Sequence, residues 1–286
     1  MKILVIIISA LAVVFSSCAT GQNVGGDGST GQSGSTGGRA QGGQIPVETK
    51  ISILFADGSL DEYTTTEWDS SFTNRAYQNR YSASGALLEK VEFAYEEDKG
   101  WLTTKLSRDV EDHLKTRIVY QYNEQGLLWK ESLANKAGKT VSSYEYGYDS
   151  RGNRTSRIIY NATGVKLAET TYTFNNSGQL IATETKDGSG RKINSTENEY
   201  DSAGNLVSEK VYNANGDLNT IVNSVWQKGH EMENQRQGVD GVVQLRVTNE
   251  YGSSGELLHK KVENIQDEST QLLEYEYAFK PAGRAN

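Results

Sequence analysis

The sequence predicts an all-β protein: an antiparallel β-meander of tandem hairpins, forming a curved or partly rolled sheet of about 16–18 strands. Three observations predict this fold. Glycine turns recur every 26 residues, the residues between them alternate in polarity, and the two prolines, Pro46 and Pro281, lie at the ends of the repeat region. A proline inside the sheet would remove a ladder hydrogen bond, so an interior without one favours continuous strand pairing.

The first residues predict a secretory signal peptide. Lys2 precedes an apolar run from Ile3 to Phe15, which is shorter than the roughly 18 residues that a spanning helix needs. Phe15-Ser16-Ser17-Cys18 resembles a bacterial lipobox, although leucine is commoner where Phe15 stands. The resemblance implies removal of residues 1–17 and acylation of Cys18, which would anchor the chain in a membrane. Ordinary cleavage after Ala19, with an incidental cysteine, is the alternative.

Residues 18–44 predict a flexible tether after the lipidated cysteine. From Gly21 to Gln44 the chain is almost wholly Gly, Ser, Thr and Gln, with too few apolar groups to offset the entropy of ordering. As a random coil this segment reaches roughly 25–30 Å. Residues 45–286 remain as one β-hairpin repeat domain, a length that a single all-β domain can have.

Two columns of glycine turns divide this domain. One column holds Gly100, Gly126, Gly152, Gly178, Gly204, Gly229 and Gly255, and the other holds Gly58, Gly85, Gly138, Gly164, Gly190, Gly216 and Gly241. Most steps within a column are 26 residues. We expect degenerate turns without glycine near Thr73-Asn74, Asp112-His113 and Gln266-Asp267-Glu268.

The turns share a chemical pattern. An aromatic residue is followed by Asn or Asp, two more residues and then glycine, as in Tyr122-Asn123-Glu124-Gln125-Gly126 and Tyr200-Asp201-Ser202-Ala203-Gly204. The Asn or Asp side chain can accept a hydrogen bond from the backbone two residues on, and glycine supplies the positive φ that closes the hairpin.

Between the turns, the residues alternate as half-buried strands do. Tyr144, Tyr146 and Tyr148 fall on one face, with Glu145 and Gly147 on the other. The turn spacing leaves strands of about 8–10 residues, and a flat sheet of them would be roughly 80 Å wide. Because strands twist, the sheet should curl with its tyrosine face inside. Its two edges would stay exposed and could accept a partner strand.

Tyr200-Asp201-Ser202-Ala203-Gly204-Asn205-Leu206 and Tyr148-Asp149-Ser150-Arg151-Gly152-Asn153 resemble YD repeats, the units that build the walls of Rhs-type proteins. In that family, tandem hairpins coil as a long β-ribbon, and large members enclose a toxin cargo. The resemblance extends from about Ile51 to Gly283. It implies the repeat fold and no particular activity. The chain departs from the large members in lacking a cargo domain and an aspartyl cleavage core, and in having too few strands for a closed cocoon.

Charge and cysteine usage exclude several classes of function. The net charge is −8 and the pI about 5.1, with scattered lysines and arginines, so we expect no binding to nucleic acid. Cys18 is the one cysteine, which rules out a disulfide within the chain. Runs such as Glu197-Asn198-Glu199 and His259-Lys260-Lys261 are polar on both strand faces, which disfavours a transmembrane barrel.

No residue pattern predicts catalysis, a metal or a cofactor. The three histidines, His113, His230 and His259, show no metal-ligand spacing, so we interpret them as solvated or structural. No G-x-S-x-G elbow or Walker loop occurs. The glutamates recur regularly and fit the polar face of strands: Glu145, Glu169, Glu184, Glu199 and Glu209.

Two tryptophans are candidates for a binding surface. Trp101 and Trp129 follow equivalent glycines, which predicts that both lie near the same end of the sheet. A functional interpretation is an aromatic strip that stacks on sugar or grips a protein partner. Cross-strand packing of a thin core is the competing and favoured interpretation.

We therefore expect a lipid-anchored β-repeat protein of the cell envelope, held at the outer membrane through Cys18. It would act without catalysis, as a binding or structural scaffold for a protein or a glycan. The alternative is an envelope enzyme that acts on glycans through acidic residues on the concave face. The sequence leaves open the ligand, the leaflet, the oligomeric state and whether the sheet is open, rolled or paired.

Overall fold

The computed structural model describes residues 44–281, and every regular element within them is a strand. The predicted signal peptide and Cys18 lie outside the described residues, as does the tether up to residue 43. The strands are β1 Gln44–Phe55, β2 Leu60–Trp68, β3 Arg75–Ser82, β4 Leu87–Tyr95, β5 Leu102–Arg108, β6 Leu114–Tyr122, β7 Leu128–Asn135, β8 Thr140–Tyr148, β9 Arg154–Asn161, β10 Lys166–Phe174, β11 Leu180–Asp187, β12 Lys192–Tyr200, β13 Leu206–Tyr212, β14 Leu218–Gln227, β15 His230–Gly238, β16 Val243–Tyr251, β17 Leu257–Asn264 and β18 Ser269–Pro281.

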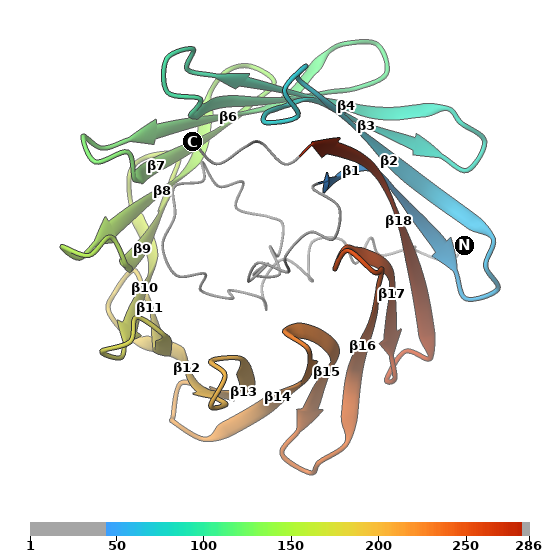
Figure 1. Ribbon diagram of the computed structural model, residues 1–286. Helices are drawn as coiled ribbons and strands as arrows, with labels where there is room; N and C mark the ends of the chain where they lie inside the picture. Colours follow the sequence, from blue (N-terminus) through green and yellow to red (C-terminus); the bar gives the residue numbers. More distant parts are fainter. Residues whose placement is uncertain (1–43, 282–286) are drawn as a thin grey trace.

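The 18 strands form one antiparallel meander that closes into a barrel (Figure 1). Each strand pairs with its neighbours in sequence, and β1 pairs with β18 over eleven residue pairs, from Gln44–Pro281 to Phe55–Gln271. The meander and the strand number are as predicted. The expectation of two exposed edges is wrong, because the seam between β1 and β18 uses both. Of the open, rolled and paired arrangements that the sequence allowed, the sheet is therefore rolled.

The turns confirm the predicted chemistry. Glycines of both columns have positive φ, for example Gly126 at 79° and Gly204 at 89°. Asn123 Oδ1 accepts hydrogen bonds from the backbone N–H of Gln125 and of Leu127, at 3.0 and 2.9 Å. The same pair of bonds recurs at Asp69, Asp109, Asn135, Asp149, Asn161, Asn175, Asp187, Asp201 and Asn213. A short side chain thus satisfies backbone donors that the turn cannot pair.

The expected degenerate turns are also present. Phe72, Asp112 and Glu268 take the left-handed conformation there, with φ of 53°, 65° and 51°. Between β14 and β15, both Lys228 and Gly229 have positive φ, at 54° and 82°. Two consecutive positive φ values are typical of a tight two-residue hairpin loop. This shorter loop accounts for the two steps of 25 residues, from Gly204 to Gly229 and from Gly216 to Gly241.

A β-bulge follows nearly every turn. Between β6 and β7, Tyr122 pairs with Leu128 but Gln121 pairs with Lys130, so Trp129 is the extra residue. The same shift, three residues after the turn glycine, occurs at hairpins on both ends of the sheet. Bulges bend a strand and increase its twist. Their repetition gives each hairpin a share of the curvature that closes the barrel.

The two faces of the wall differ in burial. Tyr120, Glu131 and Tyr144 are directly opposite one another on three successive strands, and so share a face. Most of the buried strand side chains belong to this tyrosine face, such as Tyr120 at 4% and Val247 at 5% exposure. Side chains on the concave side of a curved sheet converge and cover one another. We therefore assign the tyrosine face to the barrel interior, as predicted.

The other face carries a pattern of ion pairs. Lys50 lies 2.7 Å from Glu276, Lys130 lies 3.0 Å from Glu145, and Lys186 lies 2.8 Å from Glu184. These side chains are a quarter to more than half exposed. Exposed pairs of this kind add at most about 1 kcal/mol each to stability. Their main consequence is a hydrated, charged outer wall.

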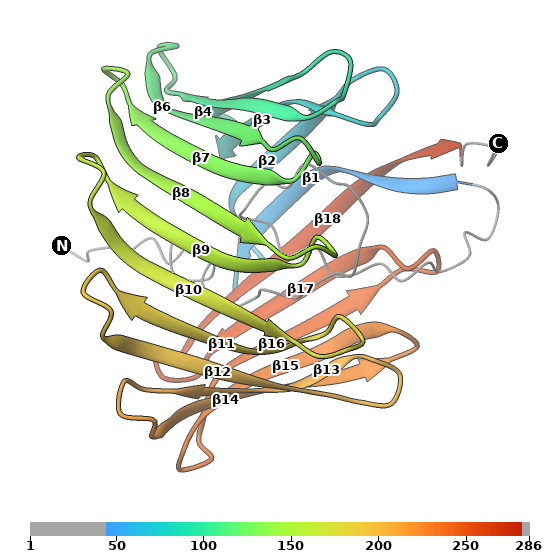
Figure 2. The same cartoon turned by 90° about the vertical axis from the view of Figure 1, so that its left-hand side faces the viewer.

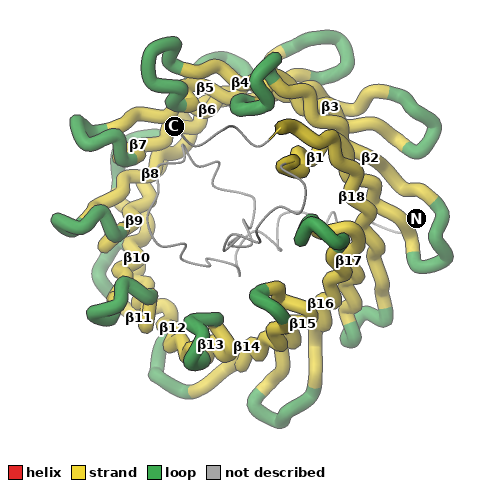
Figure 3. Tube along the Cα trace, in the orientation of Figure 1, coloured by secondary structure: helices red, strands yellow, loops and turns green. Residues whose placement is uncertain are grey.

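The barrel has two unlike ends, seen from the side in Figure 2 and as turns in Figure 3. The terminal rim carries the start of β1, the end of β18 and eight turns, from β2–β3 to β16–β17. The far rim carries the other nine turns, from β1–β2 to β17–β18. No helix in the described part of the chain is long and apolar enough to cross a membrane.

Candidate binding site

Trp101 is a packing residue of the terminal rim. Its ring lies 5.0 Å from that of Tyr122, and the Lys99 ammonium lies 4.4 Å from its centroid. A Cβ added to Gly126 would come within 2.8 Å of the indole. The same arrangement recurs on the terminal rim, where Leu127, Gln179 and His230 lie within 4.0 Å of a Cβ added at Gly152, Gly204 and Gly255. Each of them follows a turn glycine and covers the glycine of the next turn on that rim, as Trp101 does between the β4–β5 and β6–β7 turns.

Trp129 offers its ring to solvent. It is the bulged residue of β7, is 39% exposed and has the Lys130 ammonium 5.5 Å from its centroid. Both tryptophans lie at the terminal rim, but no ring contact joins them among the described residues. The structure therefore does not assemble them into one strip, because one follows its turn glycine directly and the other stands at the bulge.

The aromatic residue at the terminal-rim end of most even-numbered strands has a structural role that the sequence pattern did not reveal. Its polar tip reaches the carbonyl of the residue 20 positions earlier, at the exit of the preceding turn on the same rim. The donor–acceptor pairs are Trp68–Glu48, Tyr122–Leu102, Tyr148–Leu128, Tyr200–Leu180, Trp226–Leu206, Tyr251–Glu231 and Tyr277–Leu257. Neighbouring hairpins are thereby linked outside their ladders. Burial raises the pKa of the Tyr122 and Tyr251 phenols to about 12, so both stay protonated donors.

A second aromatic group lies on the inner wall, across β7, β8 and β9. The Arg154 guanidinium lies 4.4 Å from the Tyr146 centroid, and that of Arg157 lies 4.7 Å from the Tyr144 centroid. The Tyr146 hydroxyl donates to Glu131 Oε1 at 2.7 Å. Burial, reinforced by the Glu131 carboxylate, raises the pKa of Tyr146 above its ordinary value. We call Glu131, Tyr144, Tyr146, Arg154 and Arg157 the inner-wall platform.

The inner-wall platform can bind, because it combines flat apolar rings with hydrogen-bonding groups on one curved surface. The alternation in the sequence placed Tyr144 and Tyr146 on the same face of the sheet but did not reveal their arginine partners. Arg154 and Arg157 come from the following strand, and only the register of β8 against β9 sets Tyr146 opposite Arg157. The Nε atom of Arg157 is buried and has no hydrogen-bond partner among the described residues.

The glutamates singled out from the sequence lie apart from this platform. Glu145 and Glu184 belong to the charged outer face and pair with Lys130 and Lys186. Glu169 and Glu199 pair with Lys166 and Lys210. Glu209 is the exception, because it shares the inner face with Asn198 and Val222. Burial there raises the pKa of its carboxyl.

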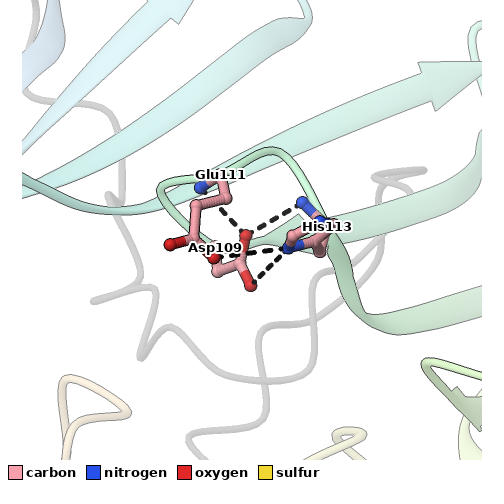
Figure 4. A group of neighbouring side chains, drawn as sticks. All are labelled: Asp109, Glu111 and His113. Carbon is pink, nitrogen blue, oxygen red and sulfur yellow. Dashed lines mark hydrogen bonds and ion pairs between the residues drawn. The ribbon is translucent and has the colours of Figure 1, made fainter.

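One exposed group brings together possible metal ligands, in the β5–β6 turn (Figure 4). His113 Nδ1 lies 3.5 Å from both Asp109 Oδ2 and Glu111 Oε2. The turn itself explains this proximity, since Asp109 Oδ1 accepts from the backbone N–H of Glu111 and of His113. These bonds, that of His113 above all, lower the pKa of the Asp109 carboxyl.

The other two histidines lie elsewhere. His230 begins β15, where its ring stacks 4.5 Å from that of Tyr251. His259 Nδ1 lies 2.9 Å from Glu250 on the outer face, where both side chains are more than half exposed. The three histidines are thus held by three separate sets of neighbours.

Neither a protein-family model nor a curated protein sequence matches the chain. Among solved structures, a porin-like protein from Bacteroides uniformis is 12% identical, with 81% of this chain and 98% of that chain covered and a TM-score of 0.42. A porin-like protein from Bacteroides vulgatus is 10% identical over 82% and 99% of the two chains, with a TM-score of 0.32. The toxin complex TcdB2-TccC3 is 13% identical; 82% of this chain covers 16% of that chain, with a TM-score of 0.31.

Proposed function

We propose that this protein is a lipid-anchored component of the cell envelope and serves as a non-catalytic scaffold that binds a carbohydrate on its inner wall. The anchor would be Cys18, at the outer membrane. The observation that carries the proposal is the contrast between the two faces. Across β7–β9 the outer face carries the Lys130–Glu145 ion pair, whereas the inner face presents aromatic rings beside guanidinium groups.

The outer wall supports a barrel that stands in water. Lipid-facing strands of transmembrane barrels carry an apolar band, and Lys or Arg at the bilayer midplane costs about 2–4 kcal/mol each. Here Lys50, Lys130 and Lys186 lie within strands on the outer face, each beside a glutamate. Attachment by a lipid and a tether, rather than by the barrel wall, fits this surface.

The inner-wall platform supports a carbohydrate as ligand. Sugar rings stack on aromatic faces, and their hydroxyls exchange hydrogen bonds with tyrosine, arginine and carboxylate groups. Tyr144 and Tyr146 supply the faces, while Glu131, Arg154 and Arg157 supply donors and acceptors. A protein ligand is the other outcome that a binding assay must distinguish.

An enzyme acting on glycans is the alternative, and the raised pKa of Glu209 is the observation that favours it. A glycosidase needs two carboxyls about 5–9.5 Å apart. The other inner-face carboxyl whose pKa burial raises, Glu48, stands on β1. β13 and β1 are six strands apart around the wall, or roughly 29 Å at 4.8 Å per strand. Scaffold function is therefore preferred, and hydrolysis of the bound glycan would reverse that preference.

Two experiments test the proposal. Metabolic labelling with a fatty acid should mark the wild-type chain and a Thr20→Ala control, but not Cys18→Ser, and protease treatment of intact cells should report the exposed side. A panel of envelope and host polysaccharides should then bind the wild type. Tyr144→Ala with Arg157→Ala should reduce that binding at least tenfold. Tyr63→Ala, which disrupts the 4.9 Å stack with Tyr81 elsewhere on the wall, should leave it unchanged.

A further inference from the structure

The turns of the far rim are apolar in a way that those of the terminal rim are not, although Trp129 and Ile181, at bulges next to terminal-rim turns, are also exposed. Every large hydrophobic side chain that is exposed and lies outside the strands, within residues 44–281, belongs to far-rim turns. They are Val110, Val165, Val239, Val242 and Ile265, exposed by 42–66%. The residue after the Asn or Asp is apolar in several of these turns, whereas terminal-rim turns have Glu124, Ser150 or Ser202 there.

The bulges of β8, β10 and β12 add to the same surface. Val141, Leu167 and Ile193 are 38%, 49% and 44% exposed and stand at the strand starts next to far-rim turns. Exposed apolar groups gathered at one end of a protein usually mark an interaction site. The charges around the far rim indicate which molecule would cover these apolar side chains.

The charges divide the far rim into two arcs. The basic arc holds Lys136 and Lys139 in the β7–β8 turn, Lys166 at the start of β10, where it pairs with Glu169, Arg191 in the β11–β12 turn, and Lys192 at the start of β12. Asp187 begins the last of these turns and pairs with Arg191 at 2.8 Å. Lys136 and Lys139 are exposed, and no ion pair joins either to another described residue.

The acidic arc covers most of the remaining circumference. It includes Asp217 in the β13–β14 turn, Asp240 in the β15–β16 turn, Asp267 and Glu268 in the β17–β18 turn, and Asp57 in the β1–β2 turn. All are exposed, and none forms an ion pair with another described residue. The β5–β6 turn, with Asp109, Glu111 and Asp112, continues the arc, and the β3–β4 turn is uncharged.

We propose that the far rim is a self-association surface on which a second copy of this chain docks end to end. A twofold axis across the rim makes such a contact isologous and reverses the order of the turns. An axis over the β13–β14 turn sets the β11–β12 turn against β15–β16, the β9–β10 turn against β17–β18, and the β7–β8 turn against β1–β2. The β11–β12 and β7–β8 turns thereby each meet an acidic turn, the β17–β18 turn meets Lys166 at the start of β10, and the apolar side chains lie between them.

This arrangement satisfies both features of the rim. Apolar contact supplies affinity, and opposed charges fix the rotation of one barrel against the other. It leaves the terminal rims, where β1 begins, at the two outer ends. The inference goes beyond the scaffold function and does not depend on lipidation of Cys18 or on a bound carbohydrate.

The test is co-purification of two full-length copies that carry different tags after Asn286, expressed together and extracted in mild detergent. Wild-type copies should co-purify. Lys136→Glu with Lys139→Glu should weaken co-purification of like copies by about tenfold, because an acidic turn then meets an acidic arc. Asp57→Lys should do the same, because Asp57 lies in the β1–β2 turn, which faces the β7–β8 turn of the other copy.

Mixing the two variants should restore co-purification to near the wild-type level, since the altered β7–β8 turn of one copy then faces the altered β1–β2 turn of the other, and the two unaltered turns also face each other. A matched double variant on the terminal rim, Lys99→Glu with Arg151→Glu, should change nothing. Restoration by mixing also shows that both variants fold. Failure of wild-type copies to co-purify, or failure of the mixed pair to exceed the single variants, would overturn the proposal.

Discussion

Tyr148 donates a hydrogen bond of 2.6 Å to the carbonyl oxygen of Leu128, 20 residues earlier in the chain. The bond joins the β8–β9 turn to the β6–β7 turn, although no ladder connects those two turns. Phe174 stands at the equivalent position of the next hairpin on this rim and has no hydroxyl. Tyr148 and Phe174 therefore allow the same position of the repeat to be compared with and without this hydrogen bond.

Tyr148→Phe should lower the free energy of unfolding by about 1 kcal/mol, since it removes one hydrogen bond and leaves the ring packing intact. Phe174→Tyr should raise it by a similar amount, because the new hydroxyl can reach the carbonyl of Arg154. Urea denaturation of both variants measures these changes. Equal stability of Tyr148→Phe and wild type would show that these bonds contribute nothing beyond the rings.

Packing against Trp101 should make an alanine substitution more destabilising at one of two glycines that have similar backbone conformations. Gly126 and Gly164 have φ of 79° and 78°, but an added Cβ at Gly126 would meet the indole at 2.8 Å, whereas at Gly164 it would meet nothing within 4 Å. Gly126→Ala should therefore destabilise the barrel more than Gly164→Ala, by about 1–3 kcal/mol.

Trp101→Ala should abolish the difference between these two glycine variants. A double-mutant cycle read by urea denaturation measures the coupling. If the difference persists without the indole, Trp101 does not impose the constraint, and a ligand-binding role for this tryptophan gains weight.

Acid should act on the turns that begin with aspartate. Side-chain hydrogen bonds from Asn153 and Asn205, with backbone N–H groups, lower the pKa of Asp149 and Asp201 below the ordinary 3.8. A depressed folded-state pKa stabilises the protein above the unfolded value, and this contribution is lost as pH falls from about 4 through the folded value.

Asp149→Asn with Asp201→Asn should therefore lose less stability than the wild type between about pH 4 and pH 2. Asparagine keeps the Oδ1 acceptor for the turn but does not titrate. Asn161→Asp should have the opposite effect in the same range. Urea midpoints measured along a pH series test this, and parallel curves for all three proteins would contradict it.

Glu209 should affect the pH dependence of stability in the direction opposite to Asp149 and Asp201. Burial raises the pKa of the Glu209 carboxyl above 4.5. Ionisation of Glu209 therefore destabilises the folded state. This loss of stability is absent at low pH and develops as pH rises from the unfolded-state pKa through the folded-state pKa. Glu209→Gln should stabilise the barrel at pH 7 and change little at pH 3. Glu124→Gln, in an exposed turn, serves as the control and should be neutral at both. Greater stability of wild type at pH 7 would imply an ionised Glu209 with a favourable partner.

The sequence was sufficient for local structure because each hairpin encodes itself. Gly126 marks the turn, Asn123 satisfies its donors, and Tyr144 and Tyr146 alternate with Glu145; even the degenerate turn at Asp112 was predictable from the period. Closure of the barrel was not predictable, because it depends on the pairing of Gln44–Phe55 with Ser269–Pro281. A repeat pattern contains no signal for where a curved sheet ends.

The candidate site was predictable only in part. Alternation placed Tyr144 and Tyr146 on one face, but stacking on Arg154 and Arg157 depends on strand register and on the bulge after Tyr148. For the two tryptophans, the sequence predicted the location in the sheet but not the environment of each ring. Their positions shortly after equivalent glycines correctly predicted a shared end of the sheet. A two-residue difference in spacing from those glycines nevertheless set Trp101 into packing and left Trp129 in solvent.

The seam between β1 and β18 has a kinetic consequence. Every other ladder joins strands adjacent in sequence, and so can form by local zippering. The seam must bring together residues more than 200 positions apart, which carries a larger loop-closure entropy. Folding thus divides into fast growth of an open ribbon and a slow final closure. A permuted chain cut at another hairpin and joined across β18 and β1 would move that slow step elsewhere on the ring.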